Sequence, residues 1–212
     1  MRSRADSYPA SATATLLLSG GRSERFGGRP KALLKVRGEP AVRQMAAIAL
    51  HGGLSPVVLV VRPDALDVIE AVAGLPVVVR PSERCALGRS ASINEGLGAI
   101  PSGLDVLLWP VDHPFAHAKT LRALTDAKQR DPMVAWLIPT FEGRDGHPVL
   151  IAHNVRSSVQ ALAPGDPLRI VRDRFLDRVV RVPVDDPGVV EAIDTPDAYS
   201  AASSREEQWI GD

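Results

Sequence analysis

A stretch rich in glycine and positive charge runs from Ser19 to Lys31, directly after an apolar run. Its paired glycines, Gly20 and Gly21, allow backbone amides to approach a polyphosphate closely, because glycine adopts positive φ at little cost. Arg25 and Lys31 supply cations that suit phosphate oxygens. The stretch contains neither the Gly-Lys-Ser/Thr run of P-loop proteins nor the G-x-G-x-x-G of dinucleotide-binding proteins. The alternative is a surface loop with glycines for its turns, but the density of glycine and arginine favours a phosphate site.

Two aspartates are candidate ligands for a metal ion bound to phosphate. Asp112 ends an apolar run and is followed by His113 and Pro114. A carboxylate there can hold Mg²⁺, which favours one or two carboxylates and keeps its other positions for phosphate and water. A turn or helix cap is the alternative, which Pro114 supports. Asp194 precedes Thr195, which suits a helix cap, so Asp194 is a spare carboxylate.

A third polar segment, Gly88 to Ser92, opens a predicted helix. Free amides and hydroxyls at a helix N-terminus can bind phosphate or contact the edge of a base, so Ser90 and Ser92 are candidates for that role. The alternative for one of the serines is an ordinary N-cap. Cys85, just before this segment, has no adjacent base to activate it and is expected to act as a small apolar filler.

Short apolar runs alternate with helical patterns, which is typical of a three-layer α/β/α sandwich around a mostly parallel sheet. Several runs are continuously apolar, as in strands buried on both faces. Ligands of such sheets bind at the carboxyl ends of the strands, where the glycine-rich stretch, Asp112 and Asp194 all fall. The predicted strands are Thr15–Leu18, Val57–Val61, Val77–Val79, Val106–Trp109, Val134–Ile138, Val149–Ile151 and Val179–Val184. The predicted helices are Ala41–His51, Ala65–Ala73, Ser92–Ala99, Lys119–Lys128, Val155–Leu162, Pro167–Phe175 and Thr195 to about Ser203.

Composition limits the partners and the compartment. Lys plus Arg and Asp plus Glu number 25 each, so no net charge attracts nucleic acid or a membrane, and neither is expected as a partner. One cysteine excludes an intramolecular disulfide and fits a reducing compartment. No apolar run approaches the ~20 residues that span a bilayer, and the N-terminus has no signal-peptide core. We expect a cytoplasmic protein with one domain at 13–203, a flexible tail at 1–12 and a second tail at 204–212.

The run LSGGRSERFGG that begins at Leu18, together with Lys31, resembles the signature loop of molybdenum cofactor nucleotidyltransferases and of their nucleotide-sugar and isoprenoid-precursor relatives. The resemblance implies a Rossmann-like nucleotide-diphospho-sugar transferase fold that binds a nucleoside triphosphate (NTP) with one Mg²⁺. The segments at Asp112 and Asp194 are similar to the family's two metal contacts. The implied nucleotide-binding residues are Leu18, Ser19, Gly20, Gly21, Arg22, Ser23, Arg25, Lys31, Gly88, Ser90, Ser92 and Asp112, of which Arg25, Lys31 and Asp112 are catalytic.

Gly146, His147 and Pro148 resemble the family's Gly-His-Pro loop, which faces the acceptor substrate. His147 is a candidate general base, with a turn histidine as the alternative. The implied reaction joins a nucleoside monophosphate from CTP or GTP to a small phosphorylated acceptor, molybdopterin or molybdenum cofactor, and releases pyrophosphate. An acceptor phosphate is already ionised at neutral pH, so the reaction needs charge neutralisation and positioning but no activated nucleophile. The Gly-x-Ser-x-Ser and Asp-His-Pro forms favour CTP, whereas the doubled glycine resembles the guanylyl branch.

Other functions stay open at this point. The segment GDPLR that begins at Gly165 departs from the family's Gly-Asp-x-Gly-Ala-Arg, which leaves a sugar phosphate or another small phosphate as an alternative acceptor. A catalytically idle nucleotide-binding module would keep the glycine-rich stretch but lose the metal carboxylates, and both carboxylates are present. Contact with a molybdoenzyme or its chaperone is a further open point.

Overall fold

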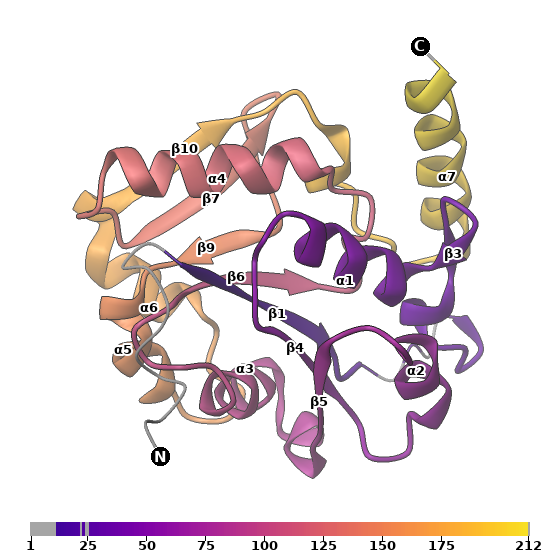
Figure 1. The fold of residues 1–212 in the computed structure, drawn as a ribbon, viewed down its shortest axis with the longest axis horizontal. Helices are drawn as coiled ribbons and strands as arrows, with labels where there is room; N and C mark the ends of the chain where they lie inside the picture. Colours follow the sequence, from indigo (N-terminus) through magenta and orange to yellow (C-terminus); the bar gives the residue numbers. More distant parts are fainter. Residues whose placement is uncertain (1–11, 22, 24–25, 212) are drawn as a thin grey trace.

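The computed structural model describes residues 12–21, 23 and 26–211, the last five of them as backbone only. Within that part of the chain, an eight-stranded sheet lies between two layers of helices (Figure 1). The strands are β1 (Thr13–Ser19), β4 (Val57–Val61), β5 (Val77–Pro81), β6 (Asp105–Pro110), β7 (Trp136–Phe141), β8 (Arg144–Asp145), β9 (Val149–Ile151) and β10 (Val179–Pro183), with a separate hairpin of β2 (Lys35–Val36) and β3 (Glu39–Pro40). The helices are α1 (Ala41–His51), α2 (Leu66–Ala71), α3 (Arg89–Gly98), α4 (Ala118–Arg130), α5 (Arg156–Gln160), α6 (Arg169–Arg172) and α7 (Pro196–Gly211), with 3₁₀ helices η3 (Lys31–Leu33), η4 (Glu83–Leu87), η5 (His153–Val155), η6 (Asp173–Arg178) and η7 (Pro187–Val189).

The strand order is β10-β7-β9-β6-β1-β4-β5, with β8 paired to β7. β1 runs parallel to β4 and β6, whereas β9 is antiparallel to both β6 and β7. β1, β4 and β6 are buried along their whole length, as expected for central strands covered on both faces. The register aligns Leu18 of β1 with Val60 of β4 and Pro110 of β6, so these strands end at one edge. The predicted mixed, mostly parallel sheet is confirmed.

Successive residues of the strands enter two separate cores. On one face Leu17 shares a core with Met45 of α1 and Leu124 of α4. On the other face Leu16 shares a core with Ile93 of α3 and with residues of α5 and α6. Removing this apolar surface from water stabilises the fold by about 25 cal/mol per Å². The predicted three-layer α/β/α sandwich is therefore confirmed.

The last helix extends further than its pattern predicted. It begins as expected, with the Thr195 hydroxyl accepting the amide of Ala198 at 3.2 Å. It then continues to Gly211 and does not end near Ser203. The helix stands away from the sheet, beside β3 (Figure 1). A third core joins it to the hairpin and to the loops that follow β6 and η7, through Leu34, Val36, Ala41, Phe115, Ile193 and Ala202.

Several short elements lie outside what the pattern predicted. β2, β3 and β8 have two residues each, too few for an alternation of apolar and polar residues to be seen. The predicted helix Pro167–Phe175 is reduced to α6 and continues as η6, with a kink at Phe175. None of the helices in the described residues is long and apolar enough to cross a membrane.

Candidate functional site

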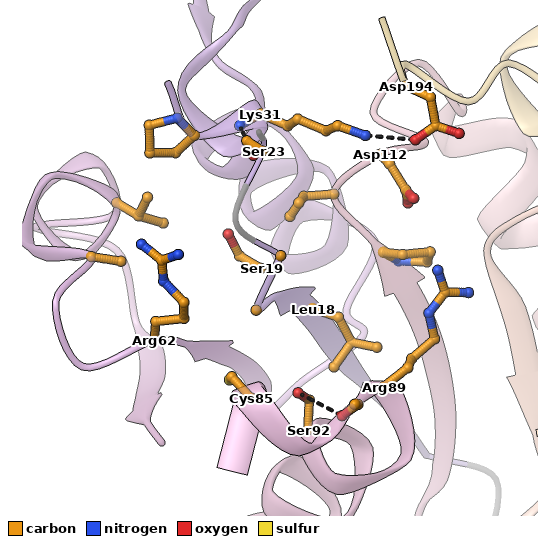
Figure 2. Close-up of a pocket in the computed structure, with 18 of the residues that line it drawn as sticks. Leu18, Ser19, Ser23, Lys31, Arg62, Cys85, Arg89, Ser92, Asp112 and Asp194 are labelled. Atoms are coloured by element: carbon orange, nitrogen blue, oxygen red, sulfur yellow. Dashed lines mark hydrogen bonds and ion pairs between the residues drawn. The ribbon is translucent and has the colours of Figure 1, made fainter. Parts of the chain in front are cut away.

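A pocket of about 540 Å³ opens at the carboxyl ends of β1, β4 and β6 (Figure 2). This is the edge at which open α/β sheets bind their ligands. Its wall combines the glycine-rich stretch, the turn before α3, the end of β6 and the segment before α7, which are far apart in the sequence. The residues that line it are Leu18, Ser19, Gly20, Gly21, Ser23, Gly28, Pro30, Lys31, Arg62, Ala65, Val68, Cys85, Gly88, Arg89, Ser92, Pro110, Val111, Asp112 and Asp194.

Close packing, and not backbone conformation, requires glycine at position 20. Neither Gly20 nor Gly21 has a positive φ, which corrects the reason that the sequence suggested for the pair. A Cβ on Gly20 would lie 3.0 Å from Cys85 Sγ and 3.2 Å from Ser92 Oγ. A larger residue would push the glycine-rich stretch away from the turn before α3, and the pocket between them would change shape.

Contacts at both ends of the residue hold Lys31 in the pocket wall. Its backbone amide donates to Ser23 Oγ at 3.1 Å, and its Nζ lies 2.6 Å from Asp194 Oδ1. The lysine side chain is 16% exposed, but that of Asp194 is 53% exposed, so solvent still screens this ion pair. Arg22 and Arg25, which were also predicted to bind the nucleotide, lie outside the described residues.

Asp112 follows β6 with one carboxylate oxygen, Oδ1, buried and without a hydrogen-bond partner among the described residues. A buried oxygen in that state is costly unless a cation or donor satisfies it. The amide of Ile193 donates to the Asp112 carbonyl at 2.8 Å, and this bond brings the next residue, Asp194, beside Asp112 (Figure 2). In the described part of the chain, no group of three or more His, Cys, Asp or Glu is arranged to hold a metal ion by itself. Two carboxylates fit a Mg²⁺ ion that takes its other ligands from phosphate and water.

The turn before α3 depends on Gly88. Its φ is 118° and a Cβ there would lie 3.0 Å from Gly165 Cα, so strain and contact both exclude a larger residue. Ser92 lines the pocket, with its hydroxyl 3.5 Å from the Gly88 carbonyl oxygen. Ser90 instead donates its hydroxyl to the carbonyl of Asp166 and lines a neighbouring pocket. Of the two predicted serines, the fold thus brings Ser92 to the first pocket and Ser90 to the second.

The second pocket, of about 460 Å³, adjoins the first, and the two share Leu18, Arg89 and Pro110. Two adjoining pockets with a common wall can hold two reactants close enough to react. Gly146 and His147, which were predicted to face an acceptor, line the second pocket. Its other lining residues are Ser90, Ile93, Leu108, Trp136, Ile138, Asp145, Val149, Gly165, Asp166, Pro167, Leu168, Arg169 and Arg172.

Positive charge exceeds negative charge in the second pocket. Arg89, Arg169 and Arg172 line it, and Arg172 is already bonded to Asp173 at 2.8 Å. Two carboxylates face them, but Asp145 is already bonded to Arg181 at 2.7 Å. Apolar side chains from β6 and β7, with Ile93 of α3 and Val149 of β9, contribute much of the remaining wall. The pocket therefore suits an anionic group attached to an apolar or aromatic body.

Two histidines lie close together beside Asp112. The rings of His113 and His147 meet edge to face, with centroids 4.7 Å apart and an interplanar angle of 67°. Burial lowers the pKa of His147 to about 4, and the neighbouring His113 adds to the shift, so the His147 ring is neutral at pH 7. Burial also lowers the pKa of His113, against the opposing charge of Asp112. A neutral His147 brings no positive charge to a phosphate, and the adjacent Pro148 is buried outside the pocket lining.

Arg62 and Arg89 line the first pocket but were not predicted from the sequence. Arg62 directly follows β4 and so lies at the ligand-binding edge, a position that could have identified it. Its guanidinium is bonded to Asp64 at 3.0 and 3.2 Å. Arg89 is the first residue of α3 and lines both pockets. No local pattern distinguishes Arg89 from other arginines, because its place between two pockets results from tertiary packing.

Comparison with known proteins gives one family and several relatives. The family model described as a MobA-like NTP transferase domain matches residues 15–182. A 2-C-methyl-D-erythritol 4-phosphate cytidylyltransferase from Streptomyces avermitilis is 30% identical over 189 residues, covering 81% of this chain and 68% of that protein. A nicotine blue oxidoreductase from Paenarthrobacter nicotinovorans is 27% identical over 155 residues, covering 71% of this chain and 76% of that protein.

Solved structures share the fold at lower identity. The structure of Rv0371c from Mycobacterium tuberculosis H37Rv in complex with manganese superposes with a TM-score of 0.71 at 22% identity, covering 91% of this chain and 98% of that one. The molybdopterin-guanine dinucleotide biosynthesis protein A of Archaeoglobus fulgidus gives a TM-score of 0.67 at 18% identity, covering 92% and 100% respectively. At these identities the likeness establishes the fold.

Proposed function

Since this chain belongs to the MobA-like NTP transferase family and is therefore a nucleotidyltransferase, we propose that it joins the nucleoside monophosphate of CTP, or of GTP, to the phosphate of molybdopterin or molybdenum cofactor. The observation that carries this proposal is the meeting of Lys31, Asp112 and Asp194 in a pocket that adjoins a second, arginine-lined pocket (Figure 2). The first pocket would hold the NTP and the second the acceptor.

The proposed reaction is an in-line displacement at the α-phosphorus of the NTP. An oxygen of the acceptor phosphate forms a bond to that phosphorus, and the bond from the phosphorus to the oxygen bridging to the β-phosphate breaks. Pyrophosphate leaves with that electron pair. Because the attacking phosphate is already ionised, the protein needs no general base, and a neutral His147 is compatible with a role in orientation. The protein's main task is to neutralise charge and position the two substrates.

The chain's own residues divide that task. Lys31 and Arg25 would neutralise the β- and γ-phosphates, while the glycine-rich stretch and Ser92 surround the nucleotide. Asp112 and Asp194 would hold Mg²⁺, which when bound neutralises phosphate charge as a Lewis acid. The buried Oδ1 of Asp112, which has no hydrogen-bond partner among the described residues, supports this assignment. The manganese complex of the mycobacterial neighbour is further support for a divalent cation.

The second pocket supports a heterocyclic phosphate as acceptor. Arg89, Arg169 and Arg172 can bind phosphate oxygens in pairs and can also stack on a flat ring. The apolar wall from β6 and β7 suits a pterin better than a bare polyol. A second candidate acceptor is a sugar or polyol phosphate, which the name of the Streptomyces relative favours.

We propose that CTP is preferred over GTP. The Streptomyces relative is named a cytidylyltransferase, which supports CTP. The Archaeoglobus neighbour is named for a guanine dinucleotide, which supports GTP.

Ligand binding and turnover test the two halves of the proposal separately. Thermal unfolding with Mg²⁺ and each of CTP, GTP, UTP and ATP should give the largest rise in Tm with CTP, since a ligand stabilises the state that it binds. Pyrophosphate release should then be measured with molybdopterin and with 2-C-methyl-D-erythritol 4-phosphate as acceptors. We expect pyrophosphate release with molybdopterin and none with the polyol phosphate. Pyrophosphate release with the polyol phosphate and none with molybdopterin would favour the second candidate acceptor. A larger rise in Tm with GTP than with CTP would overturn the preference for CTP.

A further inference from the structure

Helix α7 packs against the hairpin β2–β3, which follows Lys31 in the chain (Figure 1). The turn of the hairpin consists of Arg37 and Gly38, with φ of 52° and 83°. Glycine adopts such values readily, whereas they are unfavourable for a residue with a Cβ. Contacts in the surroundings must therefore hold Arg37 in this conformation.

Glu206 of α7 makes the contact that holds the hairpin turn. Its carboxylate, 9% exposed, lies 2.6 Å from Arg37 Nε and 3.1 Å from His117 Nε2. Burial alone would raise the pKa of Glu206, but the hydrogen bonds from His117 and Arg37 lower it overall, so the carboxylate is ionised at neutral pH. Removing the carboxylate would leave the buried part of Arg37 without its charged partner.

The same contact reaches the loop between β6 and α4. His117, at the start of α4, lies with its Nδ1 3.6 Å from Asp186 Oδ1. Asp186 is fully buried and accepts the amide of His117 at 2.8 Å and that of Gly188 at 3.1 Å. The hairpin, α7, α4 and the turn at η7 are thus joined through one buried set of charges.

A second polar contact and the third core complete the interface. The Tyr199 hydroxyl of α7 donates to the carbonyl of Lys35 at 2.7 Å. Leu34, between Lys31 and the hairpin, shares the third core with Ile193 and with Ala202 of α7. Ile193 directly precedes Asp194, so the residues that flank both members of the Lys31–Asp194 pair are packed against α7.

We propose that α7 is a positioning clamp for the nucleotide site. Docking of Glu206 on Arg37 and His117 fixes the hairpin and, through it, keeps Lys31 opposite Asp112 and Asp194. This rests on the proposed function, because it gives α7 the task of placing the phosphate-binding lysine. Glu206 lines neither of the two pockets and is a positioning residue. By thermodynamic linkage, a bound NTP must favour docking of α7 by the same factor as docking favours the NTP.

The first test separates NTP binding from acceptor binding. In Glu206→Ala, the Kd and KM for Mg·NTP should rise about tenfold if the site keeps its competent arrangement about a tenth of the time. The KM for the acceptor should change less than twofold. Glu206→Gln keeps an oxygen for Arg37 and should recover part of the affinity. The control is Ser204→Ala, which removes an exposed hydroxyl of α7 that bonds within the helix to the Ser200 carbonyl, and it should leave both constants within twofold.

The second test needs no activity. Hydrogen exchange of residues 31–40 and 196–211 should be slowed in the wild-type protein by Mg·CTP or Mg·GTP and accelerated together by Glu206→Ala. If that variant does not fold, Tyr199→Phe, which removes one hydroxyl, should accelerate the same two segments. The proposal would be overturned if a variant shows faster exchange in α7 but unchanged exchange at 31–40. An unchanged Kd for the NTP in Glu206→Ala would also overturn it. If the wild-type protein binds no NTP, the proposed function fails, while the exchange comparison still decides whether α7 holds the hairpin.

Discussion

Asp112 and Asp194 bring two carboxylates into one corner of the pocket. The two differ in their exposure to solvent and in their bonding partners. The side chain of Asp194 is 53% exposed and is neutralised by Lys31 at 2.6 Å. Asp112 keeps one buried oxygen without a partner among the described residues. Two like charges at short range repel each other, and a divalent cation bound between them relieves that repulsion. This arrangement is what the proposed binding of Mg²⁺ together with the NTP requires.

Replacing either carboxylate should remove activity and keep the fold. Asp112→Asn and Asp194→Asn preserve size but delete the charge that would hold Mg²⁺, so kcat should fall on the order of 10²-fold or more, by analogy with lost stabilisers of transition-state charge. Asp112→Asn should leave Tm unchanged or higher, because it removes the charge from a buried carboxylate that has one oxygen without a partner among the described residues. Steady-state kinetics and calorimetric titration with Mg²⁺ measure both effects.

The matched control for these variants is Asp197→Asn. Asp197 is exposed in the first turn of α7, three residues beyond Asp194, and lines neither of the two pockets. Its replacement should leave kcat and Mg²⁺ affinity near the wild-type values. Wild-type metal affinity in Asp112→Asn would contradict a shared site.

Arg89 and Arg62 should differ in which kinetic constant they control. Arg89 lines both pockets, so Arg89→Ala should lower kcat by about 10²-fold, as expected when a charge that stabilises the reacting phosphates is lost. Arg62 lines the nucleotide pocket and is already bonded to Asp64. Arg62→Ala should therefore raise the KM for the NTP and leave the KM for the acceptor unchanged. An Arg89→Ala variant that keeps the wild-type kcat and raises only the KM for the NTP, as Arg62→Ala should, would argue against a shared wall at Arg89.

At the scale of elements, the start of α3 is fixed by a glycine contact that couples the two pockets. Gly88 has a φ of 118°, and a Cβ there would lie 3.0 Å from Gly165 Cα. Gly88→Ala should destabilise the protein by about 1–3 kcal/mol, because an alanine is strained at positive φ and meets backbone. It should also raise the KM for both substrates, since Arg89 is the next residue. Urea denaturation and kinetics would test this.

Gly98, at the other end of α3, provides the control. A Cβ there has open space, and the residue is helical. Gly98→Ala should leave stability unchanged or raise it by about 0.5–1 kcal/mol, the usual gain of alanine over glycine in a helix. If Gly88→Ala behaves like Gly98→Ala, the proposed contact with Gly165 is not a constraint.

At the scale of the whole molecule, α7 and the sheet form separate packing units that meet at the nucleotide site. The two main cores hold the strands between their helices. The third core and the charges around Glu206 hold α7 to the hairpin and to the loops that bear Asp112 and Asp194. The stability of α7 docking should therefore depend on solution conditions that leave the sheet intact.

Acid pH should weaken this docking through Glu206. Its pKa is lowered in the folded protein by His117 and Arg37, against the opposing effect of burial. The unfolded chain then binds the proton more readily, so the stability from this group is present above the unfolded pKa of 4.5 and is lost as the pH falls below it. Glu206→Gln should lower Tm at pH 7 and flatten the fall of Tm between about pH 5 and pH 3. Parallel wild-type and variant curves over that range would contradict the prediction.

The sequence by itself determined the layers, most strand and helix positions and the edge of the sheet at which the proposed nucleotide pocket lies. The continuous apolar runs of β1, β4 and β6 are typical of strands covered on both faces, and the carboxyl ends of such strands share the edge at which the glycine-rich stretch begins. α1 and β4 occupy the predicted residues without change. These features depend on periodicity, turn residues and helix caps, which involve residues close together in the sequence.

Tertiary structure alone decided which distant residues meet. Lys31 and Asp194 are 163 positions apart in the sequence, and no local pattern encodes that contact. Tertiary packing also makes β9 antiparallel to β6. It places Ser90 in the second pocket and brings Arg89, Arg169 and Arg172 to the wall of that pocket. The docking of α7 through Glu206 belongs to the same class. Each of these contacts depends on strand order and on the shape of packed surfaces, which form only when the whole chain has folded.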